Sequence, residues 1–152
     1  MIDYRIRRGT LADGPAIAAM FARIRALKLP YLPILHTAEE DVAFFGGHVM
    51  AACTVWVAET DSVVGFIAWG GSEVHHLYLD VGYLGQGIGS ALLRLAMDEQ
   101  PHLELWAFQK NTDAIGFYRA RGFRVIRETD GSGNQEKEPD VRLAWDRPYS
   151  SP

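Results

Sequence analysis

Apolar residues in this chain follow two periods, and each period predicts one kind of element. Alternation of apolar and polar residues predicts a first strand at Tyr4–Arg8. Helical spacing then predicts a helix that opens near Pro15, with Asp13 as its cap, and ends before Pro30. The apolar face of this helix is expected to contain Ile17, Met20, Phe21, Ile24 and Leu27.

The middle of the chain is expected to form a short helix and then three strands. The helix is placed at Ala38–Phe45. Two runs rich in β-branched and aromatic residues, Thr54–Thr60 and Val63–Trp69, flank the turn residues Asp61–Ser62 and predict a β-hairpin. A further strand is expected at Glu73–Asp80.

The last part of the chain alternates helices and strands. In chain order it predicts a helix at Ile88–Gln100, a strand at Leu103–Phe108, a helix at Thr112–Arg121 capped by Gly122, and strands at Phe123–Glu128 and Val141–Trp145. The order favours a single α/β (α+β) domain over residues 1–152. Its mixed, twisted central sheet would have about six to seven strands, flanked by about four helices.

Composition narrows the class of protein. Of the 152 residues, 48% are apolar and 22% are charged, as in ordinary soluble globular proteins. The net charge of −4 argues against nucleic acid as the main partner. The single cysteine, Cys53, excludes an internal disulfide or a cysteine-based metal site, and we interpret it as a small buried hydrophobe. With no evident signal peptide or membrane span, a cytoplasmic protein that binds neither metal nor membrane is expected.

Three glycines, Gly85, Gly87 and Gly89, occupy every second position where a predicted strand turns into a helix. Free N–H groups and a partial positive charge at a helix N-terminus attract phosphate, and glycines let the phosphate approach. Neither the lysine of a P-loop nor the G-x-G-x-x-G spacing of a dinucleotide site is present. A purely structural turn remains an alternative, as does, more weakly, dinucleotide binding.

Two blocks of this sequence resemble the GNAT superfamily of N-acetyltransferases. "LYLDVGYLGQGIGSALL" resembles the acyl-coenzyme A segment of that family, whose motif is Arg/Gln-x-x-Gly-x-Gly/Ala. "NTDAIGFYRARGF" is similar to its later Asn-x-x-Ala-x-x-Phe-Tyr-x-x-x-Gly-Phe segment. One position departs from the family, because Leu84 stands where arginine or glutamine is usual. Weaker phosphate binding, rather than none, is expected from this change.

The resemblance implies acetyl-coenzyme A as co-substrate and assigns residues to it. The backbone of Leu77, Tyr78 and Leu79 would pair with the pantetheine arm like an added strand, and the N–H of Leu79 would face the thioester carbonyl. The diphosphate would lie on the backbone N–H groups of Gly85, Gln86, Gly87, Ile88, Gly89 and Ser90. Asn111 would reach the cofactor arm, or would only cap the next helix.

The implied reaction is direct transfer of an acetyl group to a primary amine of a small molecule or peptide. Tyr118 matches the family tyrosine that protonates the departing sulfur, and its alternative is a core tyrosine. The base stays open among Glu73, His75 and His76. Glu73, His75, Leu77 and Leu79 would share one side of the strand if no bulge intervenes. For each candidate base, a structural or surface role is the alternative.

The residues that bind the amine acceptor are the hardest to assign from the sequence. By family analogy the acceptor site would be formed by Tyr31, His36, Phe44, Phe45 and the loop Asn134–Asp140, in which Glu136, Glu138 and Asp140 would attract a cationic amine. A solvated polar loop is the alternative. Exposed edge strands are compatible with a homodimer. A rival of another class is a non-catalytic acyl-coenzyme A sensor, which would keep the glycine segment without needing Tyr118.

Overall fold

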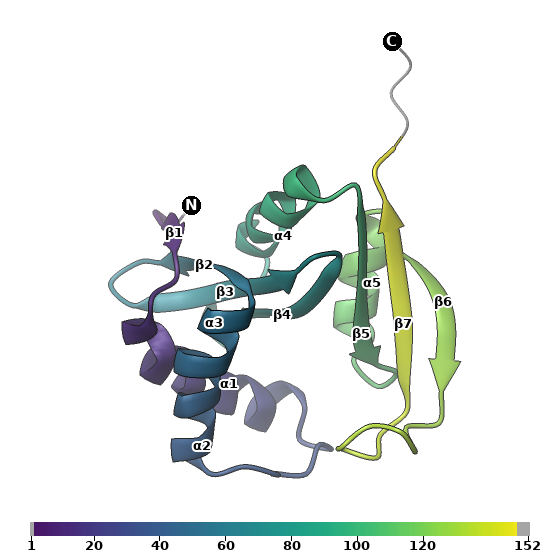
Figure 1. The fold of residues 1–152 in the computed structure, drawn as a ribbon, viewed down its shortest axis with the longest axis horizontal. Coiled ribbons are helices and arrows are strands. Elements are labelled where there is room, and N and C mark those ends of the chain that lie inside the picture. Colours follow the sequence, from purple (N-terminus) through teal and green to yellow (C-terminus); the bar gives the residue numbers. More distant parts are fainter. Residues whose placement is uncertain (1, 149–152) are drawn as a thin grey trace.

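A computed structural model describes residues 2–148, and its centre is one seven-stranded mixed sheet (Figure 1). The strand order is β1-β2-β3-β4-β5-β7-β6. The strands are β1 (Arg5–Arg8), β2 (Thr54–Glu59), β3 (Val63–Gly70), β4 (Glu73–Leu79), β5 (His102–Phe108), β6 (Arg124–Thr129) and β7 (Asp140–Asp146). All neighbours pair antiparallel except β4 and β5, which are parallel. The predicted mixed sheet is confirmed.

The longer helices fall where the helical spacing predicted them. The helices are α1 (Gly14–Lys28), α2 (Ala38–Ala43), α3 (Met50–Ala52), α4 (Ile88–Glu99) and α5 (Thr112–Ala120), with single turns η1 (Leu11–Asp13) and η3 (Val81–Tyr83) and the wide-turn helix η2 (Phe44–Val49). The short α3 was not predicted. Within residues 2–148, the helices are all too short or too polar to cross a bilayer.

Two apolar cores lie on opposite faces of the sheet, because successive side chains of a strand point to opposite sides. One core packs α4 and α5 against Ile67 and Trp69 of β3. The other packs α1 and η2 against Phe66 and Ala68 of the same strand. The helices are therefore divided between the two faces, and α1 and α4 enclose the middle of the sheet (Figure 1).

Four details of the first third of the chain differ from the prediction. Asp13 does not cap α1; its buried carboxylate pairs with Arg7 at 2.8 Å and accepts from the N–H of Thr10 at 2.8 Å, so it caps the preceding turn. Leu27 is 65% exposed and does not join Ile17, Met20 and Ile24 in the core. The helix expected to end at Phe45 continues through wide turns to Ala52. Cys53, expected to be buried, is half-buried against the α1 core.

The fold separates β4 from β5 along most of their length. Within the described residues, these two strands pair only at Glu73 and Glu104, and the chains then diverge (Figure 1). A bulge also interrupts β4, since Ala68 pairs with His76 whereas Trp69 pairs with Val74. The parallel pair therefore forms a fork that is closed at Glu73 and open at the other end.

Candidate cofactor and amine site

A cavity of about 400 Å³ occupies the α4–α5 side of the fork. Its lining comes from β4, α5 and the glycine segment, and includes the predicted residues Leu77, Tyr78, Leu79, Leu84, Gly89, Asn111 and Tyr118. Ile24 and Leu29 of the α1 end add apolar walls. The structure therefore brings together residues from both sequence blocks around one elongated space.

The backbone of β4 offers hydrogen bonds toward this space. The N–H of Asp80 donates to the carbonyl of Val64, on the β3 side. Because N–H groups alternate in direction along a strand, those of Leu77 and Leu79 point the other way, toward the open fork. Tyr78 directs its backbone to β3 and offers its ring to the cavity instead.

The glycine segment leaves its amides free. Gly85 and Gly87 have φ angles of +77° and +83°, which favour glycine, and a Cβ at either position would meet open space. Gly87 caps α4 without a side chain, and the first N–H with a backbone acceptor is that of Ala91, bonded to Gly87 at 3.1 Å. Within residues 2–148, the N–H groups from Gly85 to Ser90 have no acceptor in the protein. They form a ready anion site.

Arg121 lies beside this segment, and sequence reasoning missed it. Its Nε and Nη2 donate to the hydroxyl of Ser90 at 2.8 and 2.6 Å, and its guanidinium stacks on the ring of Phe117 at 3.7 Å. It has no carboxylate partner in the described part of the chain. Leu84, by contrast, is 47% exposed and brings no charge. The signal that was available is an arginine one turn beyond the Phe-Tyr pair of α5.

Asn111 and Tyr118 both lie on α5. Asn111 caps the helix by accepting from the N–H of Ala114 at 3.3 Å, and it also lines the cavity, so the two predicted roles are compatible. The ring of Tyr118 is held edge-on between Phe117 and Phe123, with ring centres 5.2 and 5.3 Å away. Burial and the neighbouring Tyr78 raise the pKa of the Tyr118 phenol well above its usual value, so it stays protonated.

A second cavity, of about 520 Å³, lies on the other side of β4. We call it the amine cavity. It shares Leu29 and Tyr78 with the cofactor cavity, so the two meet at the fork. Its walls are mainly aromatic, and its lining includes Phe21, His36, Glu40, Asp41, Phe44, Phe45, His76, Phe108 and Glu136. Its carboxylates are accompanied by the guanidinium of Arg25, which lies over the ring of Phe21 at 5.0 Å.

His76 is the one candidate base that lines the amine cavity. Its ring is surrounded by Phe44, Phe45 and Phe66, with centres 5.7, 5.4 and 6.1 Å away, and its buried Nδ1 has no hydrogen-bond partner among the described residues. Burial, with a smaller contribution from the charge of His75, lowers the pKa of His76 from 6.5 to about 4. The imidazole is therefore neutral near pH 7.

This burial predicts a pH-dependent stability. Below pH 6.5 the unfolded chain takes up a proton on His76 that the folded chain resists down to about pH 4, so stability falls as pH decreases through that window. The variant His76→Leu should lose less stability than the parent between pH 7 and pH 5. Urea unfolding at both pH values measures the difference, and an equal loss in both proteins would contradict the assignment.

Glu73 and His75 lie outside both cavities. The bulge places His75 on the surface as the unpaired extra residue of β4, so the expected alignment of Glu73, His75, Leu77 and Leu79 on one side is wrong. Glu73 is held at the closed end of the fork by Arg142, at 2.7 and 2.5 Å. The same arginine binds Glu104 at 2.9 Å. These contacts favour structural roles for both predicted bases.

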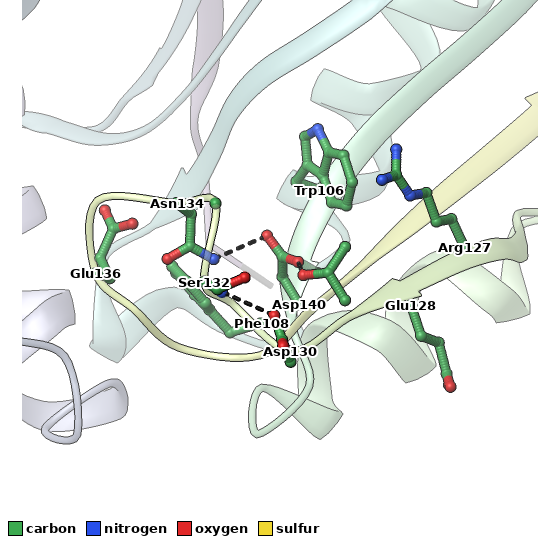
Figure 2. Close-up of a pocket in the computed structure, with 12 residues that line it drawn as sticks. Trp106, Phe108, Arg127, Glu128, Asp130, Ser132, Asn134, Glu136 and Asp140 are labelled. Carbon is green, nitrogen blue, oxygen red and sulfur yellow. Dashed lines mark hydrogen bonds between the residues drawn. The ribbon is translucent and has the colours of Figure 1, made fainter.

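The acceptor residues predicted from the C-terminal loop are only partly brought together. Glu136 lines the amine cavity, but Glu138 pairs with Lys110 at 3.0 Å. Asp140 is buried and accepts from the hydroxyl of Thr129 and from Asn134 at 3.1 Å (Figure 2). Tyr31 contacts Phe108 edge-on at 6.5 Å rather than lining the cavity.

Comparison with known proteins gives consistent matches. The family model for the acetyltransferase (GNAT) domain matches residues 51–125. A peptidyl-lysine N-acetyltransferase, YjaB, of Salmonella typhimurium is 33% identical over 144 residues, covering 92% of this chain and 97% of the relative. The peptidyl-lysine N-acetyltransferase YiaC of Escherichia coli is 36% identical over 123 residues, covering 80% of this chain and 84% of the relative.

Solved structures share the fold. Apo YjaB from Escherichia coli superposes with a TM-score of 0.78 at 23% identity, covering 97% of this chain and all of that one. The PaiA N-acetyltransferase of Thermoplasma acidophilum, solved with coenzyme A, gives 0.76 at 18% identity, covering 95% and 99%. With a relative this similar over nearly its whole length, the chain belongs to the GNAT family of N-acetyltransferases.

Proposed function

We propose that this protein transfers an acetyl group from acetyl-coenzyme A to the side-chain amine of a lysine in a peptide or protein. The observation that carries the proposal is the open fork, which joins two cavities of different chemistry at Tyr78 and Leu29. The relatives of this chain that are named as peptidyl-lysine N-acetyltransferases support the choice of a lysine acceptor over a small-molecule amine.

The residues around the cofactor cavity fit acetyl-coenzyme A. The backbone N–H groups from Gly85 to Ser90 would hold the diphosphate, and the outward N–H groups of Leu77 and Leu79 would hold the pantetheine arm. Arg121 would supply the positive charge that Leu84 does not bring. When bound, this co-substrate supplies an activated acetyl thioester.

Residues on one side of the fork would act on the thioester, and residues on the other side would act on the amine. The N–H of Leu79 is proposed to stabilise negative charge on the thioester oxygen. Tyr118, protonated, would donate its hydroxyl proton to the departing sulfur, and its phenolate would then take a proton back from solvent. On the amine side, Glu40, Asp41 and Glu136 would attract the lysine ammonium.

The base on the amine side is proposed to be His76. Its neutral, unpartnered Nδ1 would accept a proton from the amine, directly or through one water. Its low pKa makes it a weak base, so its main contribution would be to orient the neutral amine. Glu73 is bound by Arg142 and His75 faces solvent, and neither is retained as a base.

Release of free thiol from acetyl-coenzyme A tests the proposal. The protein should release thiol in the presence of lysine-containing peptides, and mass spectrometry should find one acetyl group on the lysine Nε. Peptides in which arginine replaces the lysine are the matched control. Binding of acetyl-coenzyme A without acetylation of any lysine peptide would instead favour the sensor alternative, and binding of NAD alone would contradict the cofactor assignment.

A further inference from the structure

A third cavity, of about 730 Å³, lies outside the two described above. We call it the outer cavity. Its walls are the ends of β5 and β6 and the loop between β6 and β7. It shares Phe108 and Glu136 with the amine cavity, and it has no lining residue in common with the cofactor cavity. The three cavities therefore follow one another, with the amine cavity in the middle.

The loop that forms the outer cavity is held in one conformation. Asn134 donates to the carboxylate of Asp140 at 3.1 Å and to the carbonyl of Glu138 at 2.8 Å, and Asp130 accepts from the N–H of Ser132 at 2.9 Å (Figure 2). Gly131 has a φ of +83°, and a Cβ there would lie 2.3 Å from the backbone of Glu138. The cavity is thus preformed by the loop's own hydrogen bonds and does not require a ligand to shape it.

The lining of the outer cavity suits a cationic, partly apolar ligand. Trp106 is 45% exposed although it lies within β5. Arg142 lies over its ring, with the guanidinium carbon 5.2 Å from the ring centre, so a ligand cation would use the exposed part of the ring that Arg142 leaves open. Glu136 forms no ion pair within residues 2–148. The lining carries four carboxylates, those of Glu128, Asp130, Glu136 and Asp140, against the single guanidinium of Arg127. Glu128 points away from the other labelled side chains in Figure 2, so Glu136 is the carboxylate we assign to the ligand.

We propose that the outer cavity binds the residues that flank the target lysine, and that it selects cationic side chains there. This inference rests on the proposed function. A peptide whose lysine enters the amine cavity can continue past Phe108 and Glu136, the two residues that border both spaces. A flanking arginine or lysine would then lie against Trp106 and near Glu136. A small-molecule amine would fill the amine cavity alone and gain nothing from the outer one.

A set of matched substrates distinguishes the contribution of the outer cavity from that of the amine cavity. The substrates are a blocked single lysine, which reaches only the amine cavity, and three peptides with the same central lysine and with arginine, alanine or glutamate flanks. We expect the highest kcat/KM for the arginine-flanked peptide and the lowest for the glutamate-flanked one. Raising the salt concentration should narrow the difference, because it depends on charge.

The variant Trp106→Ala tests the cavity itself. It should lower kcat/KM for the arginine-flanked peptide about tenfold, and leave the blocked lysine within about twofold. Trp106→Phe should restore much of the loss, because a phenyl ring keeps an aromatic face. Ile126→Ala is the control, since Ile126 is 49% exposed on β6 of the same sheet and lines none of the three cavities.

A binding measurement distinguishes this inference from the proposed function. A labelled arginine-flanked peptide with norleucine in place of the target lysine should bind more weakly to Trp106→Ala in fluorescence anisotropy, with no turnover involved. Equal affinity for parent and variant would overturn the inference, as would equal kcat/KM for all three flanks. If no lysine substrate is acetylated, the proposed function fails, and the anisotropy result still decides whether this cavity binds cationic peptides.

Discussion

Replacing Tyr118 by phenylalanine should lower kcat about 10²-fold while changing the affinity for acetyl-coenzyme A by less than about twofold. The physical reason is that the phenol holds a proton at the open fork, where the thiolate would leave, and phenylalanine has none to give. The ring remains packed between Phe117 and Phe123, so the fold should tolerate the change. Single-turnover kinetics with a lysine peptide, together with calorimetric titration of acetyl-coenzyme A, measures the two quantities separately.

Tyr4→Phe is the matched control for that experiment. Tyr4 also packs against the α4–α5 core through its ring, but it lines none of the cavities, so loss of its hydroxyl should leave kcat unchanged. A Tyr118→Phe protein with full activity would return Tyr118 to the role of a core residue. It would also leave the departing sulfur to be protonated by water.

Replacing Arg121 by leucine should weaken binding of acetyl-coenzyme A about tenfold or more. A hydrogen bond to a charged group contributes about 1.5–3 kcal/mol. The Arg121 guanidinium lies at the N-terminus of α4 and has no carboxylate partner in residues 2–148. The affinity of the parent should fall with rising salt more steeply than that of the variant. Calorimetric titration at two salt concentrations measures both effects.

Two further variants make the Arg121 experiment decisive. Arg119→Leu removes the same charge from an exposed position of the same helix that lines no cavity, so it should have little effect. Adding Leu84→Arg to Arg121→Leu should recover much of the lost affinity, because position 84 lines the cofactor cavity. Failure of this second change to recover binding, or an equal loss in Arg119→Leu, would mean that Arg121 stabilises α5 and does not contact the phosphates.

Much of the fold was predictable because its signals are local. The β-branched and aromatic runs of β2 and β3, the glycine segment and the helical spacing of α4 each depend on neighbouring residues in the sequence. The bulge at His75 depends instead on how β3 pairs with β4, and no residue within β4 predicts it. For the same reason, the periodicity placed His75 on the wrong side.

Site residues could be predicted from the sequence only where they belong to a recognisable motif. The glycine segment was indicated by its own spacing, its assignment to acyl-coenzyme A and the role of Tyr118 came from the family resemblance, and both lie at the cofactor cavity or its entrance. Arg121 and the salt bridge between Glu73 and Arg142 join residues far apart in the chain, so they required the folded structure. The composition of the C-terminal loop also did not predict that its residues line two different cavities.

Titration of the ¹⁵N-labelled protein with coenzyme A most directly tests the claim that backbone amides at the start of α4 hold the cofactor's diphosphate. The amide signals of Gly87, Ile88 and Gly89 should shift most, those of Leu77 and Leu79 should shift with them, and the surface residue Arg119 should not respond. Signals from residues 85–90 that stay in place while coenzyme A binds elsewhere would contradict the account.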